Sequence, residues 1–338
     1  MNVSVLQLGP MPPPYGGIAT HVAALKHRLD KNNIRNDVAS FEAISALKYI
    51  FRHHIIHSHE ISARSKILLP LLKYFRKRII LSVHGDGLED QLTNNQVLRL
   101  NPFGKRLLRK ALKYYDAVIV ANDKIKRFLL YIGIKDNRIF VIPEFIPTEN
   151  AWDYRVDRPE IDLFVRGRKM FFLSGDLRNY NGVYLYGFDL IFEFAKNNKR
   201  LEERICFFIN VTSYRNSGSI EELERLRIDN HLENFVYVNK KPLRSALSLI
   251  KESFALVRAT NTDGNSVSIL EALHQRVPVI ASDVVDRPKS CLLFKSRDQE
   301  DLSKQILHLI DNHPSVKGNI SEMFNSFDRI KEIYESLS

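Results

Sequence analysis

The sequence predicts an α/β protein with two doubly wound, Rossmann-like domains, each built on a parallel sheet covered by helices. Short apolar runs alternate with amphipathic stretches, the alternation stops between Thr148 and Arg168, and the same alternation then begins again. The 338 residues are 44% hydrophobic and 26% charged, which is the balance of a globular enzyme with room for two cores.

In the first half, apolar runs typical of buried parallel strands are separated by helical stretches. We expect strands at Val3–Leu8, Ile55–His59, Ile79–His84, Ala117–Ala121 and Ile139–Pro143. Helices are expected near 17–31, 65–76, 103–114 and 124–132. Residues 1–150 are therefore assigned to an N-terminal Rossmann-like domain.

A charged segment with Trp152 and Pro159 predicts a linker at 151–168. Beyond it, strands are expected at Phe171–Ser174, Ile205–Val211, Phe235–Val238, Ala255–Arg258 and Val277–Ser282, with the last helices near 298–311 and from 321 to the end. Residues 169–338 are assigned to a second Rossmann-like domain with terminal helices. Two such domains would face each other across a cleft at the carboxyl ends of their strands.

Cysteine usage and hydropathy indicate the compartment. Cys206 and Cys291 stand 85 positions apart without His clusters beside them, which argues against a zinc site and against a disulfide-built fold. No run approaches the roughly 20 apolar residues of a membrane span, and the N-terminus does not resemble a signal peptide. We expect a cytoplasmic protein with no metal site.

Positive charge is confined to the first half. Residues 1–147 carry 23 Lys and Arg against 11 Asp and Glu, whereas the remainder carries 27 against 28. Such asymmetry indicates an anionic partner or, alternatively, a solubilising face. The basic segments Leu68–Arg78 and Phe103–Tyr115 could lie on anionic lipid, or their apolar stripes could pack on the sheet with the cations in water. No aromatic platform or binding motif accompanies the charge, so nucleic acid is not expected.

The segment Val257–Leu273 has the pattern of a strand, a loop and a helix. Gly264 permits a tight turn, and Asn265 or Ser266 can cap the following helix, whose free N–H groups and dipole form an anion site. Asp263 and Glu271 would stand on either side of this site. Spacing alone favours an ordinary helix cap over an anion site.

This segment resembles the donor-site signature of the retaining glycosyltransferase family 4 (glycosyltransferase group 1), which has the GT-B fold. Seven residues separate Asp263 from Glu271, Ala-Leu follows, and Val277–Asp283 reads Val-Pro-Val-Ile-Ala-Ser-Asp. The resemblance implies that Glu271 binds the donor ribose and that Asp263 faces the transferred sugar, although the usual residue there is Glu, one methylene longer. It also implies an acceptor-side first domain and allows the C-terminal helix to cross back to it.

Two further segments extend the resemblance. Gly16 and Gly17, after a proline run, are similar to the family's opening loop and would let the backbone approach the donor; they do not form a dinucleotide-binding G-x-G-x-x-G motif. His84 follows a predicted strand and matches a family histidine near sugar and acceptor. His57 and His59 are interpreted as structural.

The sequence departs from the family where the second domain begins. The positions that commonly carry Arg and Lys for the diphosphate hold Asp176 and Tyr186. Arg178 or Arg258 could supply the missing charge. The backbone at Gly264, Asn265, Ser266 and Val267 would complete the phosphate site.

These features predict a retaining, metal-independent glycosyltransferase of the hexosyltransferase type. Its co-substrate would be a nucleotide-diphosphate sugar, with no further cofactor. Its acceptor would be a glycan, lipid-linked, used in cell-surface polysaccharide biosynthesis by a peripheral protein on the inner face of the plasma membrane. The alternatives are a nucleotide-sugar epimerase or hydrolase of the same fold, and a catalytically silent relative that binds nucleotide.

Overall fold

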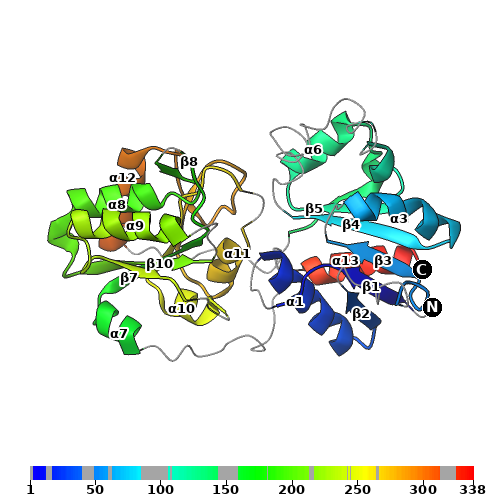
Figure 1. The fold of residues 1–338 in the computed structure, drawn as a ribbon, viewed down its shortest axis with the longest axis horizontal. Coiled ribbons are helices and arrows are strands. Elements are labelled where there is room, and N and C mark those ends of the chain that lie inside the picture. The colour runs from blue at the N-terminus through cyan, green and yellow to red at the C-terminus, as the bar shows by residue number, and fades with distance from the viewer. Residues whose placement is uncertain are drawn as a thin grey trace. The chain divides into compact units, whose positions relative to one another are not determined.

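Two compact units make up the chain, and each contains a six-stranded parallel sheet (Figure 1). The first unit comprises residues 1–148, 264–266 and 321–338, and the second comprises 149–263 and 267–320. The structure, a computed structural model, describes residues 3–12, 17–39, 49–59, 63–84, 106, 109–143, 159–180, 182–212, 217–241, 243, 245–263, 266–312 and 325–338.

The sheet of the first unit has the strand order β2-β1-β3-β4-β5-β6. Its strands are β1 (Ser4–Leu8), β2 (Arg35–Ala39), β3 (Ile55–Ser58), β4 (Arg78–Val83), β5 (Ala117–Val120) and β6 (Ile139–Val141). Every residue of β1, β3 and β5 is buried, as expected for central parallel strands covered on both faces. The order reverses between β1 and β3, so the topological switch point lies there.

Helices cover both faces of this sheet. One core joins it to the apolar residues of α3 (Ala63–Tyr74) and α6 (Asp123–Tyr131), and a second joins it to α1 (Gly17–Lys31) and α13 (Ser326–Ser336). The start of α6 is fixed by Asn122, whose side chain accepts a hydrogen bond of 3.0 Å from the Ile125 N–H.

The C-terminal helix α13 belongs to the first unit, which corrects the assignment of all of 169–338 to the second domain. The physical reason is its apolar face: Phe327, Ile330 and Ile333 are buried in the core that α1 shares with the sheet. Figure 1 shows α13 and α1 in this unit although they stand at opposite ends of the chain. The crossing-back of the C-terminal helix that the family resemblance allows is present.

The sheet of the second unit has the order β11-β10-β7-β12-β13-β14. Its strands are β7 (Lys169–Gly175), β10 (Ile205–Val211), β11 (Val236–Asn239), β12 (Ala255–Arg258), β13 (Val279–Ser282) and β14 (Leu292–Phe294); a separate hairpin pairs β8 (Asn179–Tyr180) with β9 (Val183–Tyr184). The seven residues of β10 are all buried and pair with the seven residues of β7. In sequence order this is the 3-2-1-4-5-6 arrangement of the Rossmann fold.

Six helices among the described residues accompany this sheet, and Figure 1 shows α8 and α9 on one face with α10 on the other. They are α7 (Pro159–Val165), α8 (Phe188–Asn197), α9 (Ser217–Asp229), α10 (Leu247–Glu252), α11 (Val267–His274) and α12 (Gln299–Asn312). The core contains packed aromatic rings, with Phe207 between Phe171, Phe194 and Phe235 at centroid distances of 5.4–5.6 Å.

The predicted linker is shorter than expected, because α7 occupies residues 159–165 of the segment 151–168. Proline is favoured in the first turn of a helix, so Pro159 starts this helix rather than extending the linker. Residues 151–158 lie outside the described residues. None of the helices that the structure describes has both the length and the apolar character required to span a bilayer.

Candidate functional site

The switch point of the second sheet lies between β7 and β12. From β7 the chain moves outward to β10 and β11, and it then returns to the other side of β7 for β12, β13 and β14. Ligands of doubly wound folds bind outside the carboxyl ends of the strands at such a point. Gly175 ends β7 and Arg258 ends β12, so both stand where a ligand is expected.

Asp263 lies between two arginines at this edge. Its Oδ1 accepts from Arg258 Nη2 at 2.9 Å, and its Oδ2 accepts from Arg258 Nε and from Arg287 Nη1, both at 2.9 Å. The side chains of Arg287, Asp263 and Arg258 are 2%, 7% and 14% exposed, so this is a buried cluster. We refer to Arg258, Asp263 and Arg287 as the arginine pair cluster.

The cluster carries one net positive charge. Burial alone would raise the pKa of the Asp263 carboxyl, but the charges and hydrogen bonds of Arg258 and then Arg287 outweigh burial, so its pKa lies below the ordinary value. Arg287 Nε donates to the Ser282 carbonyl at 3.1 Å, whereas Nη2 is a buried donor without a partner among the described residues. A buried positive charge with an unused donor favours an anionic ligand.

Tyr186 supports Arg258 from one side. The guanidinium carbon of Arg258 lies 4.7 Å from the centroid of the Tyr186 ring, a cation–π distance. Gly175 makes this possible: a Cβ there would stand 2.2 Å from Tyr186 Cγ, so the strand end needs a glycine to admit the ring. Tyr186 occupies a position where the sequence departs from the family pattern, and here its ring holds an arginine in place.

Arg178, the other predicted cation, pairs with its neighbour Asp176. Arg178 Nε donates to both Asp176 oxygens at 2.9 and 2.8 Å, and its side chain is 40% exposed. This pair is neutral and more solvated than the arginine pair cluster. The structure therefore gives Arg258 and Arg287 the more concentrated positive charge.

Glu271 lies in α11, the short helix that begins at Val267, between Asp263 and Arg287 in sequence. Burial raises the pKa of its carboxyl to about 7, and no described residue forms a hydrogen bond or ion pair with it. A carboxyl group in such surroundings gains by accepting hydrogen bonds from a ligand. Ser266 is buried just before Val267 begins the helix, and the predicted phosphate-binding residues Gly264 and Asn265 lie outside the described residues.

The predicted residues of the first half stand in the first unit. Gly17 is the first residue of α1, and a Cβ there would meet nothing within 4 Å; Gly16 lies outside the described residues. His84 follows β4, and its Nε2 is 3.0 Å from Nδ1 of His59, which follows β3. His21 of α1 completes a group of three imidazoles, with ring centroids 5.0 Å from His84 and 5.5 Å from His59.

His57 and His59 are buried beside each other, with ring centroids 4.3 Å apart. His57 Nδ1 is 2.6 Å from the Tyr334 hydroxyl and Nε2 is 2.8 Å from the Ser82 hydroxyl, so the structural interpretation is confirmed for His57. Burial lowers the pKa of both rings well below the ordinary value, and neighbouring histidines lower it further.

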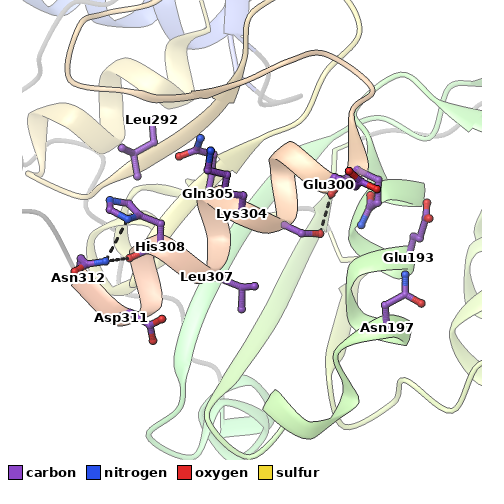
Figure 2. Close-up of a pocket in the computed structure, with 12 residues that line it drawn as sticks. Glu193, Asn197, Leu292, Glu300, Lys304, Gln305, Leu307, His308, Asp311 and Asn312 are labelled. Carbon is purple, nitrogen blue, oxygen red and sulfur yellow. Dashed lines mark hydrogen bonds between the residues drawn. The ribbon is translucent and has the colours of Figure 1, made fainter.

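A groove on the second unit lies elsewhere, between α8 and α12 (Figure 2). Figure 2 shows His308 and Asn312 joined by a hydrogen bond along α12, with Glu193 and Asn197 on α8. Its charged residues have both signs, and none of the predicted site residues lines it.

Sequence reasoning missed Arg287 and His21. Arg287 stands 24 positions from Asp263, so their contact depends on the tertiary fold. His21 gave no signal of its own, because a histidine near the start of a helix is compatible with many surroundings. Its neighbours become visible only when β3 and β4 are paired.

Comparison with known proteins bears on this geometry. The profile described as Glycosyltransferase Family 4 matches residues 39–150. The matched segment lies almost entirely in the first unit. No curated protein matches the sequence.

Solved structures contain the same two Rossmann-like domains, and the chain has the GT-B fold. It is similar to sucrose-phosphate synthase from Thermosynechococcus elongatus, with a TM-score of 0.77, 14% identity and 99% coverage of both chains. HepE from Anabaena, solved in complex with UDP, gives a TM-score of 0.70 and 12% identity over 99% of this chain and 100% of that one. A putative UDP-N-acetylglucosamine 2-epimerase from Listeria monocytogenes gives 0.66 and 15%, over 99% and 96%.

Proposed function

We propose that the chain is a glycosyltransferase that moves a sugar from a nucleoside diphosphate donor to a glycan acceptor. The observation that carries the proposal is the arginine pair cluster at the switch point of the second sheet. It has a buried net positive charge and, at Arg287 Nη2, a donor without a partner among the described residues, so it is suited to bind an anion. The family 4 match and the UDP-bound HepE of the same fold support a UDP-sugar as the first donor to test.

In the proposed complex, Arg258 and Arg287 bind the donor diphosphate. Sugar transfer leaves negative charge on the departing phosphate, and fixed cations that face this charge lower the barrier more than cations that must first be oriented. Asp263 and Tyr186 fix Arg258 in advance. The two arginines supply charge that a divalent metal supplies in other transferases, so we propose that donor binding needs no magnesium.

Glu271 is proposed to bind the donor ribose. Its half-buried carboxyl has no partner among the described residues and its pKa is raised to about 7, so ribose hydroxyls that donate to it would stabilise the ionised form. Each such charge-assisted hydrogen bond contributes about 1.5–3 kcal/mol. Glu271 is thus a binding residue in this proposal and takes no part in proton transfer.

Asp263 and His84 are each proposed to form a single hydrogen bond to the substrates. A carboxylate has about four acceptor sites, and the arginines use three at Asp263, so one remains for a hydroxyl of the transferred sugar. For His84 the family resemblance supports a hydrogen bond to the sugar or acceptor. We propose transfer with retention, in which the acceptor hydroxyl gives its proton to the leaving phosphate.

We further propose that the acceptor is lipid-linked and that the protein meets it at an anionic membrane surface. The support is an exposed aromatic patch on the first unit, formed by Phe51, Tyr74 and Phe75, which are 59%, 81% and 41% exposed. The rings of Phe51 and Phe75 are 5.1 Å apart, and those of Tyr74 and Phe75 are 5.4 Å apart. Arg52, Arg76 and Lys77 adjoin them in sequence, a combination suited to the interface between headgroups and acyl chains.

The second basic segment behaves differently. In the described part of 103–115, Ala111, Leu112 and Tyr115 are buried in the core of the first unit, whereas Arg109, Lys110 and Lys113 are exposed. Its apolar stripe therefore packs on the sheet, which was one of the two alternatives. The aromatic patch is the surface that we propose for lipid, at the inner face of the plasma membrane and in the service of polysaccharide synthesis.

The deciding experiment follows nucleoside diphosphate release from a panel of UDP-, GDP- and ADP-sugars, with and without lipid-linked glycan acceptors and with or without EDTA. Acceptor-dependent release that persists in EDTA is expected. A changed sugar nucleotide without acceptor would instead identify an epimerase, release without acceptor a hydrolase, and nucleotide binding without turnover a silent relative. Arg287→Met should weaken UDP binding at least tenfold, whereas Arg225→Met, on the exposed face of α9, serves as the matched control.

A further inference from the structure

Three histidines meet at the switch point of the first sheet, and the proposed transfer chemistry gives a role to His84 but not to His21 or His59. His59 follows β3, His84 follows β4, and His21 lies on α1, the helix that follows β1. One ring nitrogen from each can be chosen so that all lie within 4.8 Å of one another. Three separate elements thus direct imidazole nitrogens to one point at the carboxyl edge, where doubly wound sheets bind ligands.

Within this group, His59 Nδ1 and His84 Nε2 lie 3.0 Å apart. Two neutral imidazole nitrogens can approach this closely when one proton lies between them, or when both lone pairs face a cation. Two nitrogens bound to one tetrahedral zinc ion at about 2.0 Å are separated by about 3.3 Å. The spacing of His59 Nδ1 and His84 Nε2 is therefore already close to that of two ligands on one ion. His21 offers a nitrogen to the same group, in which one atom from each ring lies within 4.8 Å of the others.

The His59 ring is held from both sides. A Cβ on Gly9 would stand 3.1 Å from His59 Cβ and 3.5 Å from its Cδ2, so Gly9 leaves the ring only the space it fills. On the other side lies His57, whose ring nitrogens are both engaged by Tyr334 and Ser82. His57 is thereby fixed as a neighbour rather than a ligand, and Nε2 of His59 remains buried without a partner among the described residues.

We propose that His21, His59 and His84 bind a divalent transition-metal ion, with Zn²⁺ as the representative. Neutral imidazoles are preferred ligands of zinc, copper and nickel, whereas magnesium and calcium prefer oxygen. Three protein ligands leave a fourth position for water or an oxygen of a bound molecule, the arrangement of an open rather than a closed zinc site. The inference differs from the sequence-based expectation, which placed no metal in this chain because the cysteines lacked neighbouring histidines.

The test uses the full chain without a histidine tag, stripped with a chelator and then titrated with Co²⁺ and Zn²⁺. We expect one Co²⁺ per chain with visible d–d absorption in the intensity range of four-coordinate nitrogen sites, and loss of this absorption when Zn²⁺ is added. Zn²⁺ should also raise the melting temperature.

His84→Ala and His21→Asn should each reduce Co²⁺ and Zn²⁺ affinity at least tenfold. His84 is the more exposed ligand, so His84→Ala is the variant expected to keep its fold, which circular dichroism checks. His27→Asn, on the same helix α1 but outside the group, is the matched control and should bind as the unaltered protein does. Absence of d–d absorption at equimolar Co²⁺ would overturn the proposal, as would unchanged affinity in the folded His84→Ala variant. Either result would mean that a hydrogen bond, and not a metal ion, holds His59 and His84 together.

Discussion

Arg258 forms a bidentate ion pair with Asp263 through two hydrogen bonds of 2.9 Å, from Nε to Oδ2 and from Nη2 to Oδ1. This two-point geometry fixes the plane of the guanidinium, and the third bond, from Arg287 to Oδ2, ties a second arginine to the same carboxylate. One acidic residue therefore determines where two cations stand. The shorter side chain of Asp263, compared with the family's usual Glu, is the length that this arrangement uses.

Replacing Asp263 by Asn should destabilise the protein strongly, because two buried arginines lose their counter-charge. Breaking a buried ion pair by removing one partner costs about 3–5 kcal/mol. Urea unfolding measures the change, with Asp176→Asn as the control, since its partner Arg178 is 40% exposed and the loss should be about 1 kcal/mol or less. Equal effects of the two substitutions would contradict the structural role assigned to Asp263.

The Asp263 contribution should also depend on pH. Because its pKa is lowered in the folded protein, the stabilisation is present above the ordinary carboxyl pKa of about 3.9 and is lost as the pH falls through the folded value. The unaltered protein and the Asn variant should therefore converge in stability in acid. Unfolding curves collected from pH 6 downward would reveal a constant difference if Asp263 did not titrate in this way.

For Glu271, the dependence of stability on pH should have the opposite sign to that of Asp263, and Glu271→Gln tests it. Because the pKa of Glu271 is raised to about 7, the folded protein resists ionisation that the unfolded chain undergoes near about 4.3, so stability falls as the pH rises between these values. The Gln variant lacks this loss, and its advantage in melting temperature should be larger at pH 8 than at pH 5.

Nucleotide binding supplies the second readout for Glu271. Ribose hydroxyls favour the ionised carboxylate, so UDP affinity of the unaltered protein should increase as the pH rises through about 7. The titration of the UDP phosphates affects both proteins alike, and the difference between them isolates Glu271. If calorimetric titrations gave parallel pH profiles of UDP affinity for the unaltered protein and Glu271→Gln, Glu271 would not bind the ribose.

Gly175→Ala should weaken nucleotide binding through Tyr186. The added Cβ would lie 2.2 Å from Tyr186 Cγ, so the ring must leave its place against Arg258. Overpacking of this kind costs about 1–3 kcal/mol of stability, and the released arginine should lower UDP affinity. Gly17→Ala is the contrasting substitution, because nothing lies within 4 Å of its Cβ, and it should leave the melting temperature unchanged.

The membrane proposal predicts that Tyr74→Ser combined with Phe75→Ser abolishes much of the binding to anionic vesicles. Withdrawing one large side chain from an apolar environment costs about 1.5–3 kcal/mol, so a loss of roughly tenfold or more is expected. Flotation with phosphatidylglycerol vesicles measures it, and Tyr131→Ser, with a ring 82% exposed on α6, is the control. If vesicle binding did not depend on the anionic lipid, or did not change in the double variant, the aromatic patch would not be the membrane-binding surface.

The sequence predicted the regular elements well where hydrophobic periodicity was strong. The bounds expected for α1, β10 and β12 coincide with those observed, since each has a clear apolar pattern. Two strands of the six-stranded sheets were not predicted, and both stand at sheet edges; the short hairpin of β8 and β9 was not predicted either. β2 reads Arg-Asn-Asp-Val-Ala and β14 has three residues, so neither has the apolar run of a central strand.

The candidate site was predictable only in part, for a physical reason. Asp263, Arg258 and Glu271 lie close together in sequence, so a motif could identify them. Arg287 and the three imidazoles come together through strand pairing, and no local pattern reports which loops a sheet edge will bring into contact. The role of Tyr186 depended in addition on the space that Gly175 leaves for its ring.

The hydroxyl of Tyr334 lies 2.6 Å from His57 Nδ1 in the core of the first unit. Tyr334→Phe removes this bond and leaves a buried ring nitrogen unsatisfied, which should cost about 1–3 kcal/mol in urea unfolding. Tyr131→Phe, with its exposed ring, should cost nothing measurable. A silent Tyr334→Phe would mean that the contact contributes nothing to stability.

The position of α13 also constrains the order of events during synthesis. A ribosome makes the strands of the first unit before those of the second, yet the core of the first unit includes Phe327, Ile330 and Tyr334, which emerge after the whole second sheet. Domains usually fold as they leave the ribosome, amino-terminal end first. Here an apolar face of the first unit stays uncovered until α13 has been synthesised. Nascent chains stalled before residue 326 should therefore depend on chaperones far more than full-length chains released from the ribosome.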